Sequence, residues 1–335
     1  MSHTLSPRLI ETVVRKMLRD AKDSPERSLR NVVDLALHFS VSPAQERFFD
    51  TARQILRDEH SAYYSLVRDL LFHVDEERLV SFGMALGYNG CIAGSKTIRS
   101  LAEDGLRVPW FLTLDTGGRT DTYVEKAYQS LIQQGKQLGI NTYALLPSGA
   151  PRAFLPLAEA HPDCAFVFFC QPEDITTAFL EEAEALPNLV PAIRCREEAE
   201  DACQKLRDRQ FLYALYYPYG TDIGPGPGED LLCLAENFHA PLTLLLPQPG
   251  CPPTVRKQVY ERMSALRCRQ PCRTIPWDLL QDGQTVDRLV ARDTVPVYFD
   301  SAGQLRSMAD GQCLTTHTLF DQPLSSLLRE AFPQG

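Results

Sequence analysis

Residues 108–121 read Val-Pro-Trp-Phe-Leu-Thr-Leu-Asp-Thr-Gly-Gly-Arg-Thr-Asp, and this stretch decides the fold class. An apolar run of strand length ends at Asp115, and a glycine-bearing loop leads into a helix that begins near Thr122. In α/β proteins, binding and chemistry occur where a strand ends and its loop begins. The loop after Asp115 is therefore the first place to look for a functional site.

The same strand–loop–helix unit recurs along the next part of the chain. Strand-like runs cover residues 110–115, 141–146, 164–170, 189–194, 211–217 and 241–246, and helical segments lie between them. Apolar runs that are buried on both faces and joined by helices are typical of a parallel sheet. The sequence therefore predicts an α/β fold with a partial (β/α)6 barrel of the TIM-like kind.

The flanking segments have a different pattern. Residues 1–107 are predicted to be all-helical, and a helix is expected over residues 254–266. Residues 295–308 read as a β-hairpin around Asp300-Ser301-Ala302-Gly303, and a short helix closes the chain. We therefore expect three parts: a helical region at 1–107, a barrel core at 108–250 and a C-terminal part at 251–335.

Composition excludes several classes of protein. The net charge of -9 and the lack of a Lys/Arg-rich run disfavour a nucleic-acid partner. No apolar run has the length of a membrane span, and the first residues do not resemble a signal peptide. Ten scattered cysteines without a Cys-x-x-Cys pair then indicate reduced thiols. The expected setting is the cytoplasm, with no membrane partner.

Three motifs suggest chemistry and fail on closer reading. Asp115-Thr116-Gly117 resembles an aspartic protease signature, but that chemistry needs two carboxylates and an all-β fold. The prolines in Gly220–Gly228 remove amide donors that a phosphate cradle would need. Cys251, Cys268 and Cys272 lack a fourth ligand at short spacing. The sequence predicts no metal site from these motifs.

Ordered landmarks along most of the chain resemble the radical S-adenosylmethionine (SAM) enzymes that carry a C-terminal SPASM-like segment. The resemblance implies a radical SAM barrel and makes residues 251–335 a helix with a SPASM-like remnant. The landmarks are Leu71–Asp75, Asn89-Gly90, Val108-Pro109-Trp110, Gln134–Ile140, Pro147–Pro151, His161–Cys164, Asn188–Ile193, Tyr217–Gly220 and Tyr298–Leu305.

Departures from that family are found at its functional positions. The family's Cys-x-x-x-Cys-x-x-Cys motif, which holds a [4Fe–4S] cluster, is missing from the loop after Asp115. Ala150 replaces the glutamate of the family's Gly-Gly-Glu-Pro loop, and Met308 stands where an auxiliary-cluster cysteine is expected. The resemblance therefore implies a degenerate relative, a pseudoenzyme without a cofactor.

Two functions follow from this interpretation. The first is a non-catalytic scaffold or regulatory partner, for an intact radical SAM relative or another protein. The second is a small-anion-binding protein, or an enzyme of different chemistry, that uses the barrel mouth. An open, polar mouth favours the second function and a plugged mouth the first. The residues expected at the mouth are Asp115, Gly117, Gly118, Arg119, Ser148, Arg152, Arg194 and Tyr217.

Overall fold

The computed structural model describes residues 7–38, 43–146, 149–220, 226–291, 293 and 295–333. Its strands form a single sheet in the order β10-β9-β8-β1-β2-β3-β4-β5-β6-β7. The strands are β1 (Phe111–Asp115), β2 (Thr142–Leu146), β3 (Ala165–Cys170), β4 (Leu189–Arg194), β5 (Ala214–Tyr219), β6 (Leu242–Pro247), β7 (Ile275–Asp278), β8 (Val297–Phe299), β9 (Gln304–Ser307) and β10 (Cys313–Thr318).

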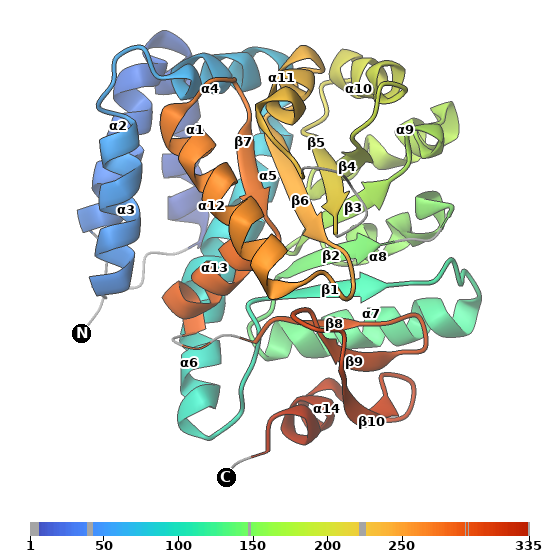
Figure 1. Ribbon diagram of the computed structural model, residues 1–335. Coiled ribbons are helices and arrows are strands. Elements are labelled where there is room, and N and C mark those ends of the chain that lie inside the picture. Colours follow the sequence, from blue (N-terminus) through green and yellow to red (C-terminus); the bar gives the residue numbers. More distant parts are fainter. Residues whose placement is uncertain are drawn as a thin grey trace.

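Strands β1 to β7 are parallel neighbours in chain order, and the first six coincide with the six predicted strands to within three residues at each end. The outer faces of these strands are covered by helices (Figure 1). They are α7 (Thr122–Gln137), η2 (Pro151–Phe154), α8 (Leu155–Ala160), η3 (Pro172–Asp174), α9 (Thr177–Ala183), α10 (Ala199–Asp208), α11 (Glu229–Asn237), α12 (Pro253–Arg269) and α13 (Gln281–Ala291). The predicted α/β fold with a partial (β/α) barrel is therefore confirmed.

A seventh parallel strand, β7, extends the barrel beyond the predicted six. It pairs with β6, so the parallel sheet crosses the predicted boundary at residue 250. On the other side of the sheet, β8 pairs in parallel with β1, and β9 and β10 continue it as antiparallel strands. No pairing joins β7 to β8 in the described ranges, so the barrel remains open between these strands.

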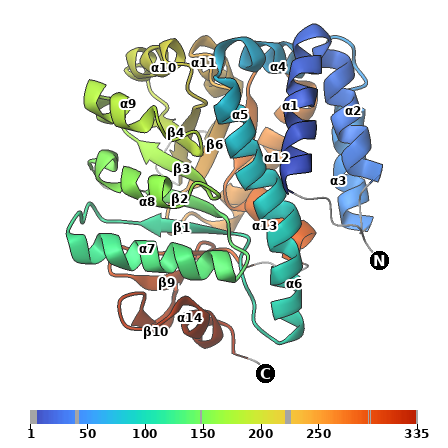
Figure 2. The ribbon, with the colours of Figure 1, turned by 180° about the vertical axis from the view of Figure 1, so that it is seen from behind.

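The first hundred residues are helical, as predicted. Their helices are α1 (Pro7–Asp23), α2 (Pro25–His38), α3 (Pro43–Ile55), α4 (Ala62–His73), α5 (Glu76–Gly83), the π-helix η1 (Met84–Gly94) and α6 (Ser95–Glu103). Seen from behind, α5 and α6 form one column beside α7, α8 and α9 (Figure 2). Within η1, a Cβ on Gly94 would lie 2.2 Å from the Gly139 carbonyl oxygen, so only glycine allows this approach.

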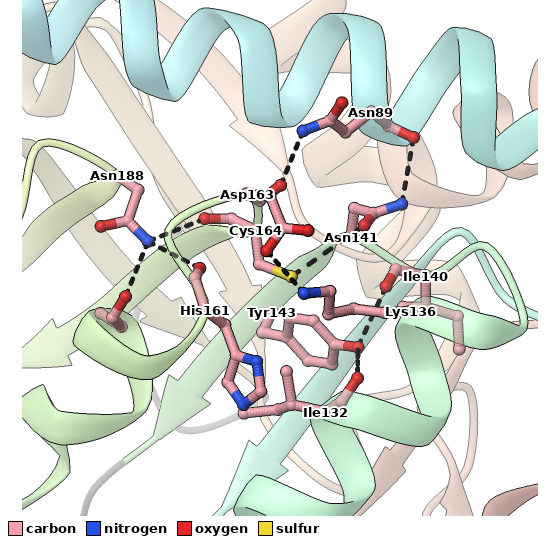
Figure 3. Close-up of polar contacts among 11 residues, drawn as sticks. Asn89, Ile132, Lys136, Ile140, Asn141, Tyr143, His161, Asp163, Cys164 and Asn188 are labelled. Carbon is pink, nitrogen blue, oxygen red and sulfur yellow. Dashed lines mark hydrogen bonds and ion pairs between the residues drawn. The ribbon is translucent and has the colours of Figure 1, made fainter.

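Polar side chains connect the amino ends of β2, β3 and β4 (Figure 3). The Asn188 amide nitrogen donates to the carbonyl oxygens of Ala158, His161 and Cys164, at 3.0–3.1 Å. Asn141 donates to the Asn89 carbonyl at 3.0 Å, and Asn89 donates to the Asp163 carbonyl. Several landmarks of the family resemblance therefore meet in a network at the edge opposite the strand ends where barrels bind ligands.

Helix α7 begins at Thr122, where the sequence predicts its start. Its N-cap is Asp121, whose side chain accepts a hydrogen bond from the Val124 amide at 3.1 Å. Aspartate is a favourable N-cap residue, because its carboxylate accepts from a backbone amide that has no partner within the helix. No helix in the described part of the chain combines the length and apolarity that crossing a membrane requires.

The segment that holds β8, β9, β10 and α14 lies at the β1 edge of the barrel (Figure 1). The predicted hairpin is present as β8 and β9, and α14 (Leu324–Ala331) has the bounds expected from the sequence. After β9, the segment from Ser307 to Gly311 reaches the open end of the barrel. Arg256 on α12 holds this segment through a hydrogen bond to the Ala309 carbonyl oxygen.

Candidate functional site

A cavity of about 320 Å³ opens at the carboxyl edge of the parallel strands, and we call it the mouth cavity. Its walls come from β1, β2, β3, β4, β5, β6 and β8, together with the segment that follows β9. The apolar part of the lining includes Leu146, Phe169, Pro218, Leu246 and Met308. An open cavity at this edge is the usual position of a ligand site in a (β/α) barrel.

Side chains of the strands alternate between the inside and the outside of the barrel. On β1, Thr113 and Asp115 line the cavity; on β5, Tyr216 and Pro218 do so. Tyr217 lies between the last two on the other face of β5, where its half-buried ring packs against the core. The structure therefore places Tyr216, and not the predicted Tyr217, in the cavity wall.

Arg194 is the basic side chain of the mouth cavity. It ends β4, and its guanidinium carbon lies 5.8 Å from the centre of the Tyr216 ring. Gln171 donates to the Tyr216 hydroxyl at 3.0 Å. Burial raises the pKa of Tyr216, while Arg194 lowers it, so the hydroxyl stays protonated at neutral pH. No ion pair between Arg194 and a carboxylate is present among the described residues.

Asp115 ends β1 and contributes a carboxylate to the cavity. Its Oδ1 accepts a hydrogen bond from the Gly117 amide at 3.0 Å, so that amide already has an acceptor. Gly117 and Gly118 have φ values of +55° and +70°, which form the tight turn after β1. A Cβ on Gly117 would lie 2.4 Å from Ser301 Cβ, so the turn packs against the β8–β9 connection.

Of the other predicted site residues, Gly117, Gly118, Arg119 and Arg152 do not line the cavity. Arg119 is exposed, with its guanidinium carbon 5.3 Å from the Phe320 ring centre and a nitrogen 3.8 Å from an Asp121 oxygen. Arg152 is exposed and its Nε donates to Glu182 at 2.9 Å. Ser148 lies outside the described residues. The structure thus brings Asp115 and Arg194 together in one cavity, whereas Arg119 and Arg152 contact other residues.

Sequence reasoning missed several polar residues of the mouth cavity. They are Thr113, Tyr216, Gln248, Tyr298 and Ser307. Strand alternation from Asp115 indicates Thr113 directly, because residues two apart on a strand share a face. The Thr113 hydroxyl is buried and has no hydrogen-bond partner. Tyr298 could be found only after the pairing of β8 with β1 was known.

The cysteines do not fit an iron–sulfur cluster at this site. The loop between β1 and α7 contains none, and a [4Fe–4S] cluster that binds SAM needs three thiolates. Cys170 ends β3 and Cys195 follows β4, but both are buried, and burial raises the pKa of both thiols, that of Cys195 to about 11. Nowhere in the described ranges do three Cys, His, Asp or Glu side chains gather as a metal site.

An open parallel barrel with this helical arrangement and a C-terminal antiparallel hairpin is the fold of the radical SAM enzymes. Solved structures similar to this chain include those of SuiB from Streptococcus suis, a radical SAM enzyme. SuiB bound to the precursor peptide SuiA matches with a TM-score of 0.51 and 9% identity, over 70% of this chain and 67% of SuiB. SuiB bound to S-adenosylmethionine matches with the same TM-score and 10% identity, over 70% and 66% of the two chains.

No protein-family profile and no curated protein sequence matches this chain. At 9–10% identity, the likeness to SuiB establishes the fold and leaves the activity open. Function must therefore be argued from the side chains of the mouth cavity.

Proposed function

We propose that this protein binds a small anionic ligand in the mouth cavity of a radical SAM barrel and does not perform radical SAM chemistry. The observation that supports it best is Arg194, a guanidinium in a cavity of about 320 Å³ without a carboxylate partner among the described residues. Guanidinium donors form a rigid fork that suits carboxylate and phosphate groups. The open cavity also favours ligand binding over a purely structural scaffold.

The non-catalytic part of the proposal rests on the β1–α7 loop, Thr116-Gly117-Gly118-Arg119-Thr120-Asp121. Without thiolates there is no cluster to supply the electron that cleaves SAM. A pseudoenzyme that binds a ligand is suited to a regulatory role. Its partner would be a protein or peptide that distinguishes the ligand-bound form from the ligand-free form. SuiB offers a parallel, since one of its structures contains the precursor peptide SuiA.

We expect anaerobic reconstitution with iron and sulfide to leave the protein without stoichiometric iron. The reason is that its thiols are scattered along the chain and most of them are buried. Iron quantitation and an absorbance scan near ~400 nm measure the result, because cluster charge-transfer bands lie there. The control is a variant in which Cys251, Cys268 and Cys272 are all serine. Cluster absorbance in the wild type that disappears in this variant would contradict the proposal.

We expect an Arg194→Gln variant to lose the response of the protein to anions. A charge-assisted hydrogen bond contributes about 1.5–3 kcal/mol, so affinity should fall about 10- to 150-fold. A thermal-shift screen of carboxylates and phosphates, followed by calorimetric titration of the hits, measures the loss. An Arg152→Gln variant should respond like the wild type, because Arg152 is paired with Glu182 outside the cavity. Equal responses of all three proteins would refute the role of Arg194.

A further inference from the structure

The mouth cavity contains one negative and one positive side chain, Asp115 and Arg194. Neither has an oppositely charged partner among the described residues. Within the described ranges, the Asp115 carboxylate accepts one hydrogen bond, from the uncharged backbone amide of Gly117. The nearby Arg306 is paired with Asp300, and Arg119 lies near Asp121. Both charges of the cavity are therefore available to a ligand.

Asp115 and Arg194 lie on strands that are three positions apart in the sheet. Asp115 on β1 pairs with Leu146 on β2, and Phe169 on β3 pairs with Ala192, two residues before Arg194 on β4. Three strand spacings of ~4.8 Å place the two backbones ~14 Å apart along the sheet. The side chains of Asp115 and Arg194 reach into the cavity and shorten this gap. A ligand that contacts both must still carry its charges several ångströms apart.

The surface between the two charges is apolar. Leu146 and Phe169 occupy the intervening strands β2 and β3 and line the same cavity. Below Asp115 on the same face of β1 lies Thr113, which is 1% exposed and whose hydroxyl has no partner. An ammonium group has three donors, and a carboxylate with an adjacent hydroxyl can accept more than one of them. The β1 side therefore suits a cation, the β4 side an anion and the middle a hydrocarbon chain.

We infer that the mouth cavity binds a small zwitterion whose ammonium and acid groups lie at opposite ends of an apolar chain. Arg194 binds the acid group, Asp115 and Thr113 bind the ammonium group, and Leu146 and Phe169 contact the chain. This inference rests on the proposed function, because it assigns the acid group of the ligand to Arg194. It adds to the proposed function that the ligand carries a second charged group and has a preferred length.

Calorimetric titration with ω-amino acids of increasing length tests the inference. The series runs from glycine through β-alanine, 4-aminobutyrate and 5-aminopentanoate to 6-aminohexanoate. Affinity should rise to a maximum among the longer members. The best of them should bind about ten-fold more tightly than the straight-chain carboxylate with the same number of carbons, which lacks the ammonium group.

Two substitutions test the contribution of each charge, because each one removes a charge and keeps the shape of the side chain. Asp115→Asn should remove the advantage of the amino acid over the matched carboxylate, and Arg194→Gln should weaken both ligands. The Asn side chain still offers an oxygen to the Gly117 amide, so the turn is retained. Arg209→Gln serves as the control and should bind like the wild type, because Arg209 is half-buried, pairs with Glu184 and does not line the cavity.

The outcomes distinguish this inference from the proposed function. If amino acids and matched carboxylates bind equally in the wild type, the zwitterion is wrong and the anion site remains. If amines without an acid group bind as well as the amino acids, Arg194 has no part and both fail. If none of the probes binds, both fail as well.

Discussion

An Arg78→Ala variant is expected to lose about 3–5 kcal/mol of unfolding free energy, because the substitution leaves buried carbonyl groups without a donor. Arg78 on α5 is 3% exposed. It donates to the carbonyl oxygens of Leu186 at 3.0 Å, Glu184 at 2.8 Å and Ala183 at 3.4 Å, at the end of α9. Its guanidinium carbon also lies 3.7 Å from the centre of the Phe211 ring. This single side chain therefore connects the N-terminal helices to the barrel.

Urea denaturation followed by circular dichroism measures the change. Arg30→Ala is the matched control, since Arg30 is exposed and 5.6 Å from the Tyr64 ring centre, and it should lose less than ~1 kcal/mol. Arg78→Met retains most of the volume and should still be strongly destabilised. A methionine variant as stable as the wild type would show that packing, and not hydrogen bonding, determines the contribution of Arg78.

An Asp287→Ala variant is expected to lose about 3–5 kcal/mol of unfolding free energy at pH 5. The carboxyl group is fully buried, and its oxygens accept hydrogen bonds from the backbone amides of Trp110 and Val295, both at 3.1 Å. These amides precede β1 and β8, so Asp287 connects the starts of two neighbouring strands. Each buried amide left without an acceptor costs about 1–3 kcal/mol.

Asp287 also makes the unfolding free energy depend on pH. Burial raises the pKa of Asp287 to about 7 and that of Asp278 to about 6, above the value of 3.8 for an ordinary aspartate. The folded protein therefore binds these protons more tightly than the unfolded chain. Their contribution is fully present below about pH 4 and is lost as the pH rises from 4 through 7.

Denaturation series at several pH values from 4 to 8 test this dependence. Asp287→Ala should have a flatter stability curve, so its deficit should shrink towards pH 8. Asp201→Ala, an exposed aspartate, should run parallel to the wild type and within ~0.5 kcal/mol of it. A deficit for Asp287→Ala that grows with pH would mean that the buried group folds as the carboxylate, against its raised pKa.

The barrel could be predicted because its signal is local. The first six strands are continuous apolar runs, and the helices between them have a regular apolar stripe. Strand β7 escaped detection because it is four residues long, Ile275-Pro276-Trp277-Asp278, and proline within a run argues against a strand. Although its residues favour a strand only weakly, β7 follows β6 in the chain and pairs with it in parallel.

The site was predicted only in part, because the sequence does not show toward which neighbours a side chain at a strand end is directed. Arg119, Arg152 and Arg194 all lie near strand ends, yet only Arg194 lines the mouth cavity. Arg152 is held outside by Glu182 on α9, and Arg119 contacts the C-terminal Phe320. On β5, the cavity is likewise lined by Tyr216, one residue before the predicted Tyr217, because neighbouring residues of a strand face opposite sides.

The sequence by itself determined the α/β class, the order of the first six strands and the absence of cysteine from the loop after Asp115. These follow from composition and from contacts between residues close in the chain. The tertiary structure decided that β8 pairs with β1, which brings Tyr298 into the mouth cavity. It also decided that Asp115 and Arg194 share that cavity across an apolar surface. The pairing of distant strands fixes both results, because their register determines which side chains face each other across the barrel.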